Sequence, residues 1–295
     1  MDRMGQPCPT MSSGRGLPGL VDLLAGGQIA GARPYQEDDY RIVAVGDGAQ
    51  DECDFLMVLA DGMGGHRGGA EASRVAVAAF VDEFAESDGS VDSRLRRALD
   101  AANSAVGIRA AEDSRLGGMG CTVVGCAVTD REEAHWISVG DSPLWCVRAA
   151  DGGRAAIHRL NADHSMRPVL EELVRRGQLA EDEVSSGSHQ LRSAVVGGRL
   201  PLVDEGQPPV RLGAGDRLVL ASDGLETLSE DEILGHCVGP GEAADIVRDV
   251  LRSVDAIARP HQDNATVLVY RHERRRAMRS RLAGLTAPTR PTPEQ

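Results

Sequence analysis

Acidic residues stand at the ends of apolar, strand-like runs at several places in this sequence. The run Phe55–Ala60 leads directly into Asp61, Arg217–Ala221 is followed by Ser222 and Asp223, and Asp263 stands just before Thr266–Tyr270. One such Asp is explained by turn formation, because its carboxylate accepts hydrogen bonds from nearby backbone and a neighbouring Gly adopts positive φ. Repetition at one kind of position instead favours carboxylates that converge on a common site.

Two further acidic groups follow the same pattern, since Asp141 comes after Ala134–Val139 and Glu37-Asp38-Asp39 comes before Arg41–Val45. Short carboxylates on rigid strand ends suit hard divalent cations, and Gly lets a backbone carbonyl join the ligands. Two such ions would lower the pKa of a bridging water and hold the oxygens of a substrate. A nearby Arg could bind a phosphate through two parallel hydrogen bonds. The residues alone therefore predict a metal-assisted phosphoester hydrolase.

The elements that must position these carboxylates are strands in clusters, with helices between the clusters. Helical spacing is found at Leu95–Val106 and Ile246–Val254, and Ala72–Phe84 is an unbroken Ala/Val-rich segment. Strand-like runs are Arg41–Val45, Phe55–Ala60, Thr122–Val128, Ala134–Val139, Leu144–Arg148, Arg217–Ala221 and Thr266–Tyr270. This order predicts an α+β fold with antiparallel sheets rather than a doubly wound parallel sheet. No dinucleotide-binding G-x-G-x-x-G follows a strand and opens a helix.

Composition narrows the function further. The 295 residues carry a net charge of −13 and include only 3% aromatic residues, which argues against a nucleic-acid binder. The chain has no Lys, which excludes a phosphate-binding loop of the Lys-containing type and Schiff-base chemistry. The six Cys show no C-x-x-C pair and are interpreted as reduced thiols, and no apolar run spans a membrane. We expect a cytoplasmic monomer with a flexible leader (1–26), one domain (27–272) and a basic, Thr/Pro-rich, disordered tail (273–295).

The motifs resemble, in family order, those of the bacterial metal-dependent Ser/Thr protein phosphatases of the PP2C (PPM) family. The matching segments are Arg33…Glu37-Asp38, Asp61-Gly62-Met63-Gly64-Gly65-His66, Gly120-Cys121-Thr122, Val139-Gly140-Asp141-Ser142, Asp163-His164-Ser165, Ser222-Asp223-Gly224 and Asp263-Asn264. The resemblance implies two antiparallel β-sheets packed as a sandwich and flanked by helices on both faces. It also implies Mn²⁺ or Mg²⁺ ions at one edge of that sandwich.

Residue roles follow from the same resemblance. Asp61 would bridge two metal ions, Gly62 would give its carbonyl to one, Asp223 and Asp263 would be carboxylate ligands, and Asp38 would act through coordinated water. Arg33 would clamp the phosphate, Glu37 would lie behind the ligands, and Asn264 would orient the Asp263 loop. The implied reaction is direct attack of a metal-bridging hydroxide on phosphoserine or phosphothreonine in phosphoproteins, the targets of a cognate kinase. Asp141 is interpreted as structural, and His66 and His164 as loop-stabilising rather than acid groups.

Departures from the family pattern leave alternatives open. A third metal site would need carboxylates where Gly117 and Thr227 stand, so we expect that site to be weak or absent, unless Asp113 or Glu226 compensates. One rival function is a non-catalytic phosphoprotein-binding module with the same fold. Another is a phosphoesterase acting on nucleotides or nucleic acid, which the net charge of −13 disfavours.

Overall fold

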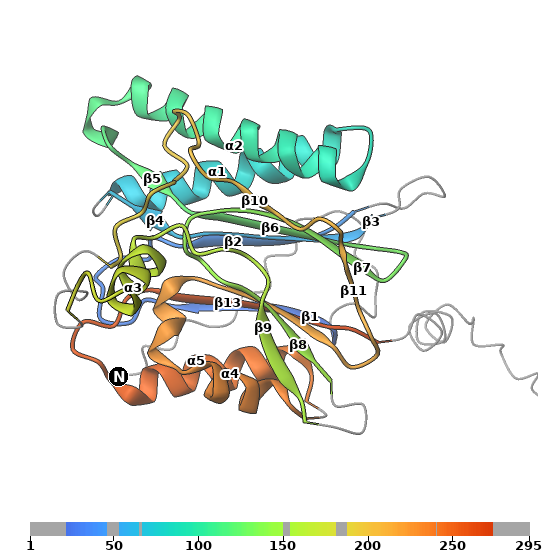
Figure 1. The fold of residues 1–295 in the computed structure, drawn as a ribbon. Helices are drawn as coiled ribbons and strands as arrows, with labels where there is room; N and C mark the ends of the chain where they lie inside the picture. Colours follow the sequence, from blue (N-terminus) through green and yellow to red (C-terminus); the bar gives the residue numbers. More distant parts are fainter. Residues whose placement is uncertain are drawn as a thin grey trace, which may run out of the picture.

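Two antiparallel β-sheets, stacked face to face and covered by helices on both outer sides, make up the computed structural model (Figure 1). It describes residues 22–45, 53–64, 67–149, 154–180, 188–239 and 241–273. The predicted sandwich with helices on both faces is therefore confirmed. No helix in these ranges is both long enough and apolar enough to cross a bilayer.

One sheet has five strands in the order β1-β13-β12-β8-β9. Its strands are β1 (Leu24–Ile29), β8 (Leu144–Arg148), β9 (Ala156–Arg159), β12 (Arg217–Ala221) and β13 (Ala265–Arg271). The strand β1 was not predicted, and its pairing with β13 from Leu24 onward corrects the boundary of the predicted leader at residue 26. Gly26 and Gly27 gave this segment a loop-like composition, yet their lack of side chains lets Tyr40 and Val247 pack against them.

The second sheet has the order β10-β7-β6-β3-β2, with β11 also paired to β7. Its strands are β2 (Asp39–Ala44), β3 (Cys53–Ala60), β6 (Val123–Thr129), β7 (Glu133–Val139), β10 (Asp204–Glu205) and β11 (Val210–Arg211). A separate ribbon of β4 (Gly62–Met63) and β5 (Gly120–Cys121) continues from β3 and leads into β6. All seven strands that the sequence predicted are present.

Helices α1 (Arg67–Glu86) and α2 (Val91–Glu112) pack on the second sheet, and α4 (Glu230–Cys237) and α5 (Ala243–Ile257) on the first. The short helix α3 (Arg167–Arg175) lies beside the strand ends near β4 in Figure 1. The predicted helices are α1, α2 and α5. The short helix α4 was missed, although its start carries a capping box in which Ser229 and Glu232 satisfy each other's backbone N–H groups.

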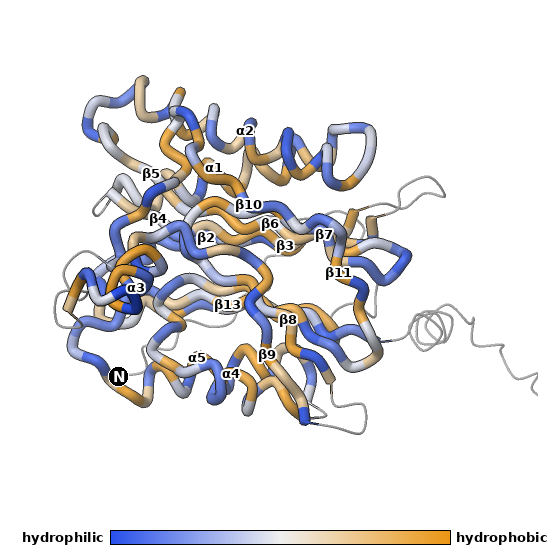
Figure 2. Tube along the Cα trace, in the orientation of Figure 1, coloured by the Kyte–Doolittle hydropathy of each residue, from blue (hydrophilic) through white to orange (hydrophobic). Residues whose placement is uncertain are grey.

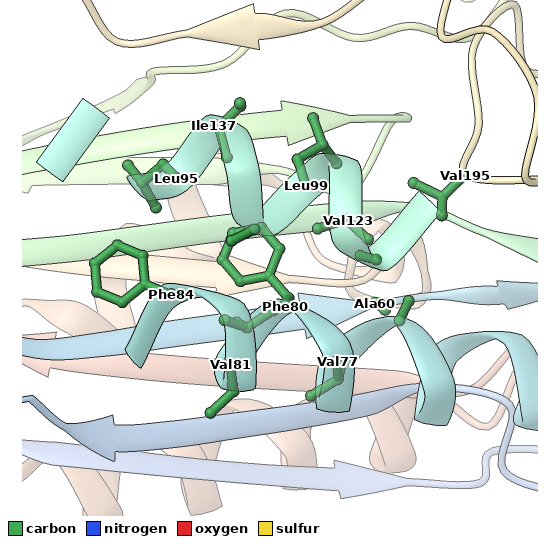
Figure 3. Close-up of a cluster of buried hydrophobic side chains, with 14 of the residues drawn as sticks. Ala60, Val77, Phe80, Val81, Phe84, Leu95, Leu99, Val123, Ile137 and Val195 are labelled. Atoms are coloured by element: carbon green, nitrogen blue, oxygen red, sulfur yellow. The ribbon is translucent and has the colours of Figure 1, made fainter. Parts of the chain in front are cut away.

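Three apolar clusters hold the layers together. One lies between α1, α2 and the second sheet, where Phe80 and Phe84 are fully buried (Figure 3). Another fills the space between the sheets and includes Phe55 and Trp136, and the last joins α4 and α5 to the first sheet. Figure 2 shows the hydrophobic colours along the central strands β3 and β6. The site described below therefore stands on strands whose positions are fixed by burial on both faces.

Cysteines within the described residues support this packing role. Cys53, Cys121, Cys126, Cys146 and Cys237 are buried and carry free thiols. Burial raises the pKa of the Cys121 thiol, which excludes it as a ready thiolate nucleophile. Cys8, the predicted leader up to residue 21 and most of the predicted tail lie outside the described residues.

Candidate active site

Strand register brings the predicted carboxylates to one edge of the sandwich. In the second sheet, Asp39 pairs with Ala60, so Asp38 and Asp61 are the next residues beyond the same end of β2 and β3. In the first sheet, Ala221 pairs with Val267, which puts the end of β12 beside the start of β13. Asp223 and Asp263 lie just beyond those two points. The four carboxylates therefore come from both layers, two from each.

Asp38 connects the two sheets. Its Oδ2 atom accepts hydrogen bonds from Ser222 Oγ at 2.8 Å and from Thr266 Oγ1 at 2.6 Å. The side chain is 6% exposed, and burial raises its pKa to about 7. The two hydroxyl donors oppose this rise, while the charges of Asp223 and Asp263 add to it. Asp38 is thus held rigidly, yet its negative charge is not neutralised by any cationic partner that the structure shows.

The backbone of Asp61 is fixed by Thr122. The Asp61 N–H donates to Thr122 Oγ1 at 3.0 Å, and the Thr122 N–H donates back to the Asp61 carbonyl at 2.8 Å. The Thr122 hydroxyl also forms a 2.7 Å hydrogen bond with Ser142 Oγ. Burial raises the pKa of Asp61 well above its ordinary value, and Asp38 and Asp223 contribute through their charges. The Asp61 side chain is therefore held in a fixed position, close to the other carboxylates of the cluster.

Gly62 stands where two backbone segments meet. A Cβ atom at this position would lie 2.3 Å from the carbonyl oxygens of Glu37 and Gly69. No other residue type fits without moving one of these segments. The requirement explains the Gly after Asp61 by close packing.

Asp223 begins the short 3₁₀ helix η3 (Asp223–Thr227), and its charge adds to the raised pKa of Asp61. Burial raises the pKa of Asp223 to about 6, with further contributions from the charges of Asp263 and Glu226. Asp263 itself forms an ion pair with Arg33, whose Nη2 lies 2.6 Å from its Oδ2. Both of these side chains are between two-fifths and one-half exposed. Arg33 therefore lies at the solvent side of the cluster, where the predicted phosphate clamp would have to be.

Asn264 ties the Arg33 loop to the start of β13. Its Nδ2 donates to the carbonyls of Ala30 at 3.0 Å and Tyr35 at 2.9 Å, and its Oδ1 accepts from the Glu37 N–H at 2.8 Å. The Glu37 carbonyl in turn accepts from Ser73 Oγ at 2.6 Å, which anchors this segment to α1. The contacts of Asn264 are those of a residue that positions a loop. The side chain of Glu37 comes close to Gly69, since a Cβ there would meet its Oε1 at 2.6 Å.

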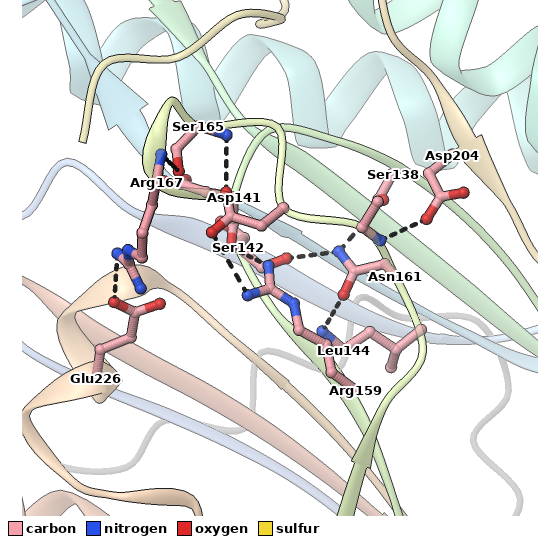
Figure 4. A network of polar contacts seen from close by, with 12 residues as sticks. Ser138, Asp141, Ser142, Leu144, Arg159, Asn161, Ser165, Arg167, Asp204 and Glu226 are labelled. Carbon is pink, nitrogen blue, oxygen red and sulfur yellow. Dashed lines mark hydrogen bonds and ion pairs between the residues drawn. The ribbon is translucent and has the colours of Figure 1, made fainter. Parts of the chain in front are cut away.

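The structure brings Asp141 into the same cluster, although its motif favoured a structural role. The residue is 5% exposed, and burial raises its pKa to about 7, with further contributions from the charges of Asp223 and Asp163. The Asp141 backbone is structural in the expected sense, because its carbonyl accepts from Arg159 Nη2 at 2.6 Å (Figure 4). Asn161 holds the same turn by donating to the Ser142 carbonyl at 2.9 Å. The signal for Asp141 was present, since it follows β7 as Asp61 follows β3.

Arg167 forms an ion pair with Glu226 at 2.7 Å, beside Asp141 in Figure 4. This contact bears on the third metal site, which the sequence predicts to be weak or absent unless Glu226 or Asp113 replaces the missing carboxylates. Asp113 is paired too, because Arg115 lies 2.7 Å from it and holds its pKa at about 2. Thr227 donates its hydroxyl to Gln262 at 2.6 Å. Each substitute carboxylate therefore already has a guanidinium partner.

His164 fits the loop-stabilising interpretation in its contacts. Its Nδ1 accepts from the Gly140 N–H at 3.2 Å, and the backbone N–H of His164 donates to the Gly140 carbonyl at 3.1 Å. Burial lowers its pKa, so the ring stays neutral and accepts this hydrogen bond over a wider pH range. The second candidate, His66, lies outside the described residues.

The donor set fits hard divalent cations. Asp38, Asp61 and Asp223 offer only oxygen atoms, and their raised pKa values show negative charge that positive charge would relieve. Among the residues described, no group of three or more Asp, Glu, His or Cys side chains is yet arranged to hold a metal ion. Asp61 and Asp223 instead lie close enough that the charge of Asp223 adds to the raised pKa of Asp61.

Comparison with known proteins agrees with this geometry. The family model described as "Protein phosphatase 2C" matches residues 36–263. A curated relative is the protein phosphatase PhpP of Streptococcus pneumoniae serotype 2, which is 32% identical over 180 residues covering 59% of this chain and 68% of PhpP. The serine/threonine phosphatase Stp of Listeria monocytogenes serovar 1/2a is 28% identical over 72% of this chain and 83% of its own length.

Solved structures show the same fold. The Mycobacterium tuberculosis serine/threonine phosphatase PstP/Ppp superimposes with a TM-score of 0.67 at 27% identity, covering 85% of this chain and 98% of the other. The catalytic domain of PstP in complex with two manganese ions gives a TM-score of 0.65 at 26% identity, covering 85% and 98%. A sandwich of this form with carboxylates at one edge defines a metal-dependent phosphatase class. The chain belongs to the protein phosphatase 2C family.

Proposed function

We propose that the protein hydrolyses phosphoserine and phosphothreonine in phosphorylated proteins, with two Mn²⁺ or Mg²⁺ ions held by the carboxylate cluster. The observation that carries this proposal is the convergence of Asp38, Asp61 and Asp223 at one edge, each with a raised pKa. Such a cluster is costly to assemble unless cations bind there. The names of the bacterial relatives as serine/threonine phosphatases support the choice of substrate.

The residues would divide the work as follows. Asp61, Asp223, Asp263 and the Gly62 carbonyl would hold the ions, and Asp38 would contact them through water. When bound, two divalent ions would supply an activated hydroxide for direct attack on phosphorus, without a phosphoenzyme. A covalent alternative through Cys121 has no support, because burial raises the pKa of that thiol.

Arg33 would bind the phosphate group from the solvent side. Its present partner, Asp263, is itself a proposed metal ligand, so a cation that bound Asp263 would release Arg33 to bind the phosphate. A guanidinium offers two parallel N–H donors to a phosphate, which a Lys would not. The exposure of the Arg33 side chain, 49%, leaves it accessible to a protein substrate.

We further propose that the third cation site is weak or absent. Gly117 has no side chain to offer, and Thr227 already donates to Gln262. Glu226 is neutralised by Arg167, whose guanidinium already supplies positive charge at this place. A hard divalent ion depends on the number of charged ligands for its affinity, and two are missing here.

Release of phosphate from a phosphothreonine peptide, with Mn²⁺ and with a chelator, tests the function. Asp61→Asn and Asp223→Asn should each lower kcat/KM by at least about 100-fold, because each removes a ligand charge. Asp249→Asn, on the exposed face of α5, is the matched control and should leave activity unchanged. Activity that survives metal removal or both site substitutions would refute the site. No turnover with Mn²⁺, together with tight binding of the phosphopeptide, would identify a non-catalytic binding module.

A further inference from the structure

We propose that Asn161 is a positioning residue for the metal ligand Asp61, on which it acts through Ser142 and Thr122. The inference rests on the proposed function, because it takes Asp61 as a ligand of the cations. Asn161 is not acidic and belongs to none of the matching motifs, so its sequence position gave no sign of this role.

Asn161 clamps the turn between β7 and β8. Its Nδ2 donates to the Ser142 carbonyl at 2.9 Å and to Ser138 Oγ at 3.2 Å (Figure 4). Its Oδ1 accepts from the Leu144 N–H at 2.8 Å. The residue is 4% exposed, and both N–H donors and the acceptor oxygen of its amide are used. These contacts hold the end of β7, the turn and the start of β8 at the same time.

The turn packs directly on Thr122. Ser142 Oγ lies 2.7 Å from Thr122 Oγ1, and both residues are buried. A Cβ atom added to Gly140 would lie 2.5 Å from Thr122 Cγ2, so no space separates the turn from this side chain. Because protein interiors are close packed, a shift of the turn would be passed on to Thr122.

Thr122 passes that position on to Asp61. It binds the Asp61 N–H through its hydroxyl and the Asp61 carbonyl through its own N–H. A ligand set works only when its members are held to within about 0.5 Å of the required geometry. Loss of a partner that supports a metal ligand from behind lowers metal affinity by about 10- to 100-fold. Asn161 is therefore expected to contribute to cation binding without touching a cation.

Strand formation alone does not account for Asn161. The strand β8 is already paired on both sides, with β12 and with β9. The Ser142 carbonyl lies beyond these pairings, and Asn161 is its donor. The clamp therefore acts on the turn, which is the part of the structure in contact with Thr122.

Calorimetric titration with Mn²⁺ tests the proposal. Asn161→Ala should raise the Mn²⁺ dissociation constant by about 10- to 100-fold in protein that circular dichroism shows to be folded. Ser142→Ala removes only the hydroxyl beside Thr122 and should raise the constant as well. The double variant should bind Mn²⁺ about as weakly as the weaker single variant, because both changes act on Asp61 by one route.

Asn103→Ala is the matched control. Asn103 also clamps a loop, since its Nδ2 donates to the Gly198 carbonyl and its Oδ1 accepts from the N–H groups of Val196 and Gly197. This variant should unfold at a lower urea concentration and bind Mn²⁺ as the unaltered protein does. Comparable weakening by Asn103→Ala would show a general effect of lower stability, and the positioning role would be wrong.

The remaining outcomes separate this proposal from the proposed function. Unchanged Mn²⁺ affinity in Asn161→Ala would refute the positioning role, and Ser142→Ala decides the matter if Asn161→Ala does not fold. Losses that multiply in the double variant would refute the route through Ser142. An unaltered protein that binds Mn²⁺ with this dependence on Asn161 but releases no phosphate from a phosphothreonine peptide would overturn the phosphatase function alone. No Mn²⁺ binding by the unaltered protein would overturn both.

Discussion

Replacing Asp38 by Asn offers a quantitative test of the electrostatics of the site. Burial raises the pKa of Asp38 from 3.8 to about 7. A carboxyl whose pKa is higher in the folded than in the unfolded state stabilises the fold at low pH, and this contribution is lost as the pH rises. Integrated from about pH 5 to about pH 7, the loss for this one group is about 2 kcal/mol. The Asn side chain is neutral throughout and avoids it.

Urea unfolding of both proteins in the presence of a chelator, at these two pH values, measures the effect. The difference between the two proteins is the useful quantity, because the pKa values of His164 and His272 are lowered by burial and their contribution to stability rises with pH. That opposite trend is common to both proteins and cancels. Relative to the unaltered protein, Asp38→Asn should therefore gain about 2 kcal/mol between the lower and the higher pH.

Saturating Mn²⁺ at the higher pH should reverse the order of stability. Cations that bind only the folded state stabilise it by mass action, and the unaltered protein keeps the full set of carboxylates. A free-energy difference that stays constant across the pH range in the chelator would refute the argument that Asp38 carries an unrelieved charge. So would Mn²⁺ stabilisation that is as large for the Asn variant as for the unaltered protein.

Three further outcomes are expected. In steady-state assays, Arg33→Ala should raise KM for a phosphopeptide by about 10-fold with a much smaller change in kcat, because the guanidinium binds the phosphate in ground and transition states alike. An unchanged KM would place Arg33 outside the substrate site. Gly117→Asp combined with Thr227→Asp should raise the Mn²⁺ stoichiometry in calorimetric titration from two toward three, whereas three tightly held ions in the unaltered protein would contradict the proposed weak third site. Gly224→Ala should lower the free energy of unfolding in urea by about 3 kcal/mol or more, since the Cβ of the new Ala would lie 1.8 Å from the Asn264 carbonyl oxygen. Near-normal stability would show that the backbone relaxes to relieve this contact.

The main strands were predictable because their apolar runs are buried on both faces, as in Cys53–Ala60 of β3. The proximity of Asp61 and Asp223 was also predictable in general terms, because carboxylates repeated at strand ends indicate a common site at one edge of the sheets. The strand β1 was not, because two Gly residues interrupt its apolar pattern and only its pairing with β13 reveals it. Local patterns do not encode such long-range partners.

The finer features of the site escaped prediction for the same reason. Ser222 and Thr266 are ordinary residues in sequence, and their donation to Asp38 depends on contacts across 184 and 228 positions. The Arg167–Glu226 ion pair likewise joins a helix to a distant 3₁₀ turn. Asp141 was recognised as part of a motif, but its charge environment depends on the packing of Asp223 and Asp163 around it.

The pairing of β1 with β13 has a consequence for how the protein is made. In the five-stranded sheet, the first strand of the described chain lies at an edge with β13 as its neighbour, and β13 is the last described strand. During synthesis, more than 230 further residues must therefore be translated after β1 before its partner β13 leaves the ribosome. The same late segment brings Asp263, the Asn264 anchor and the Thr266 hydroxyl bound to Asp38. A nascent chain thus cannot complete its carboxylate cluster until nearly all of the described sequence has been translated, and a product cut short before β13 lacks the Thr266 hydroxyl that holds Asp38.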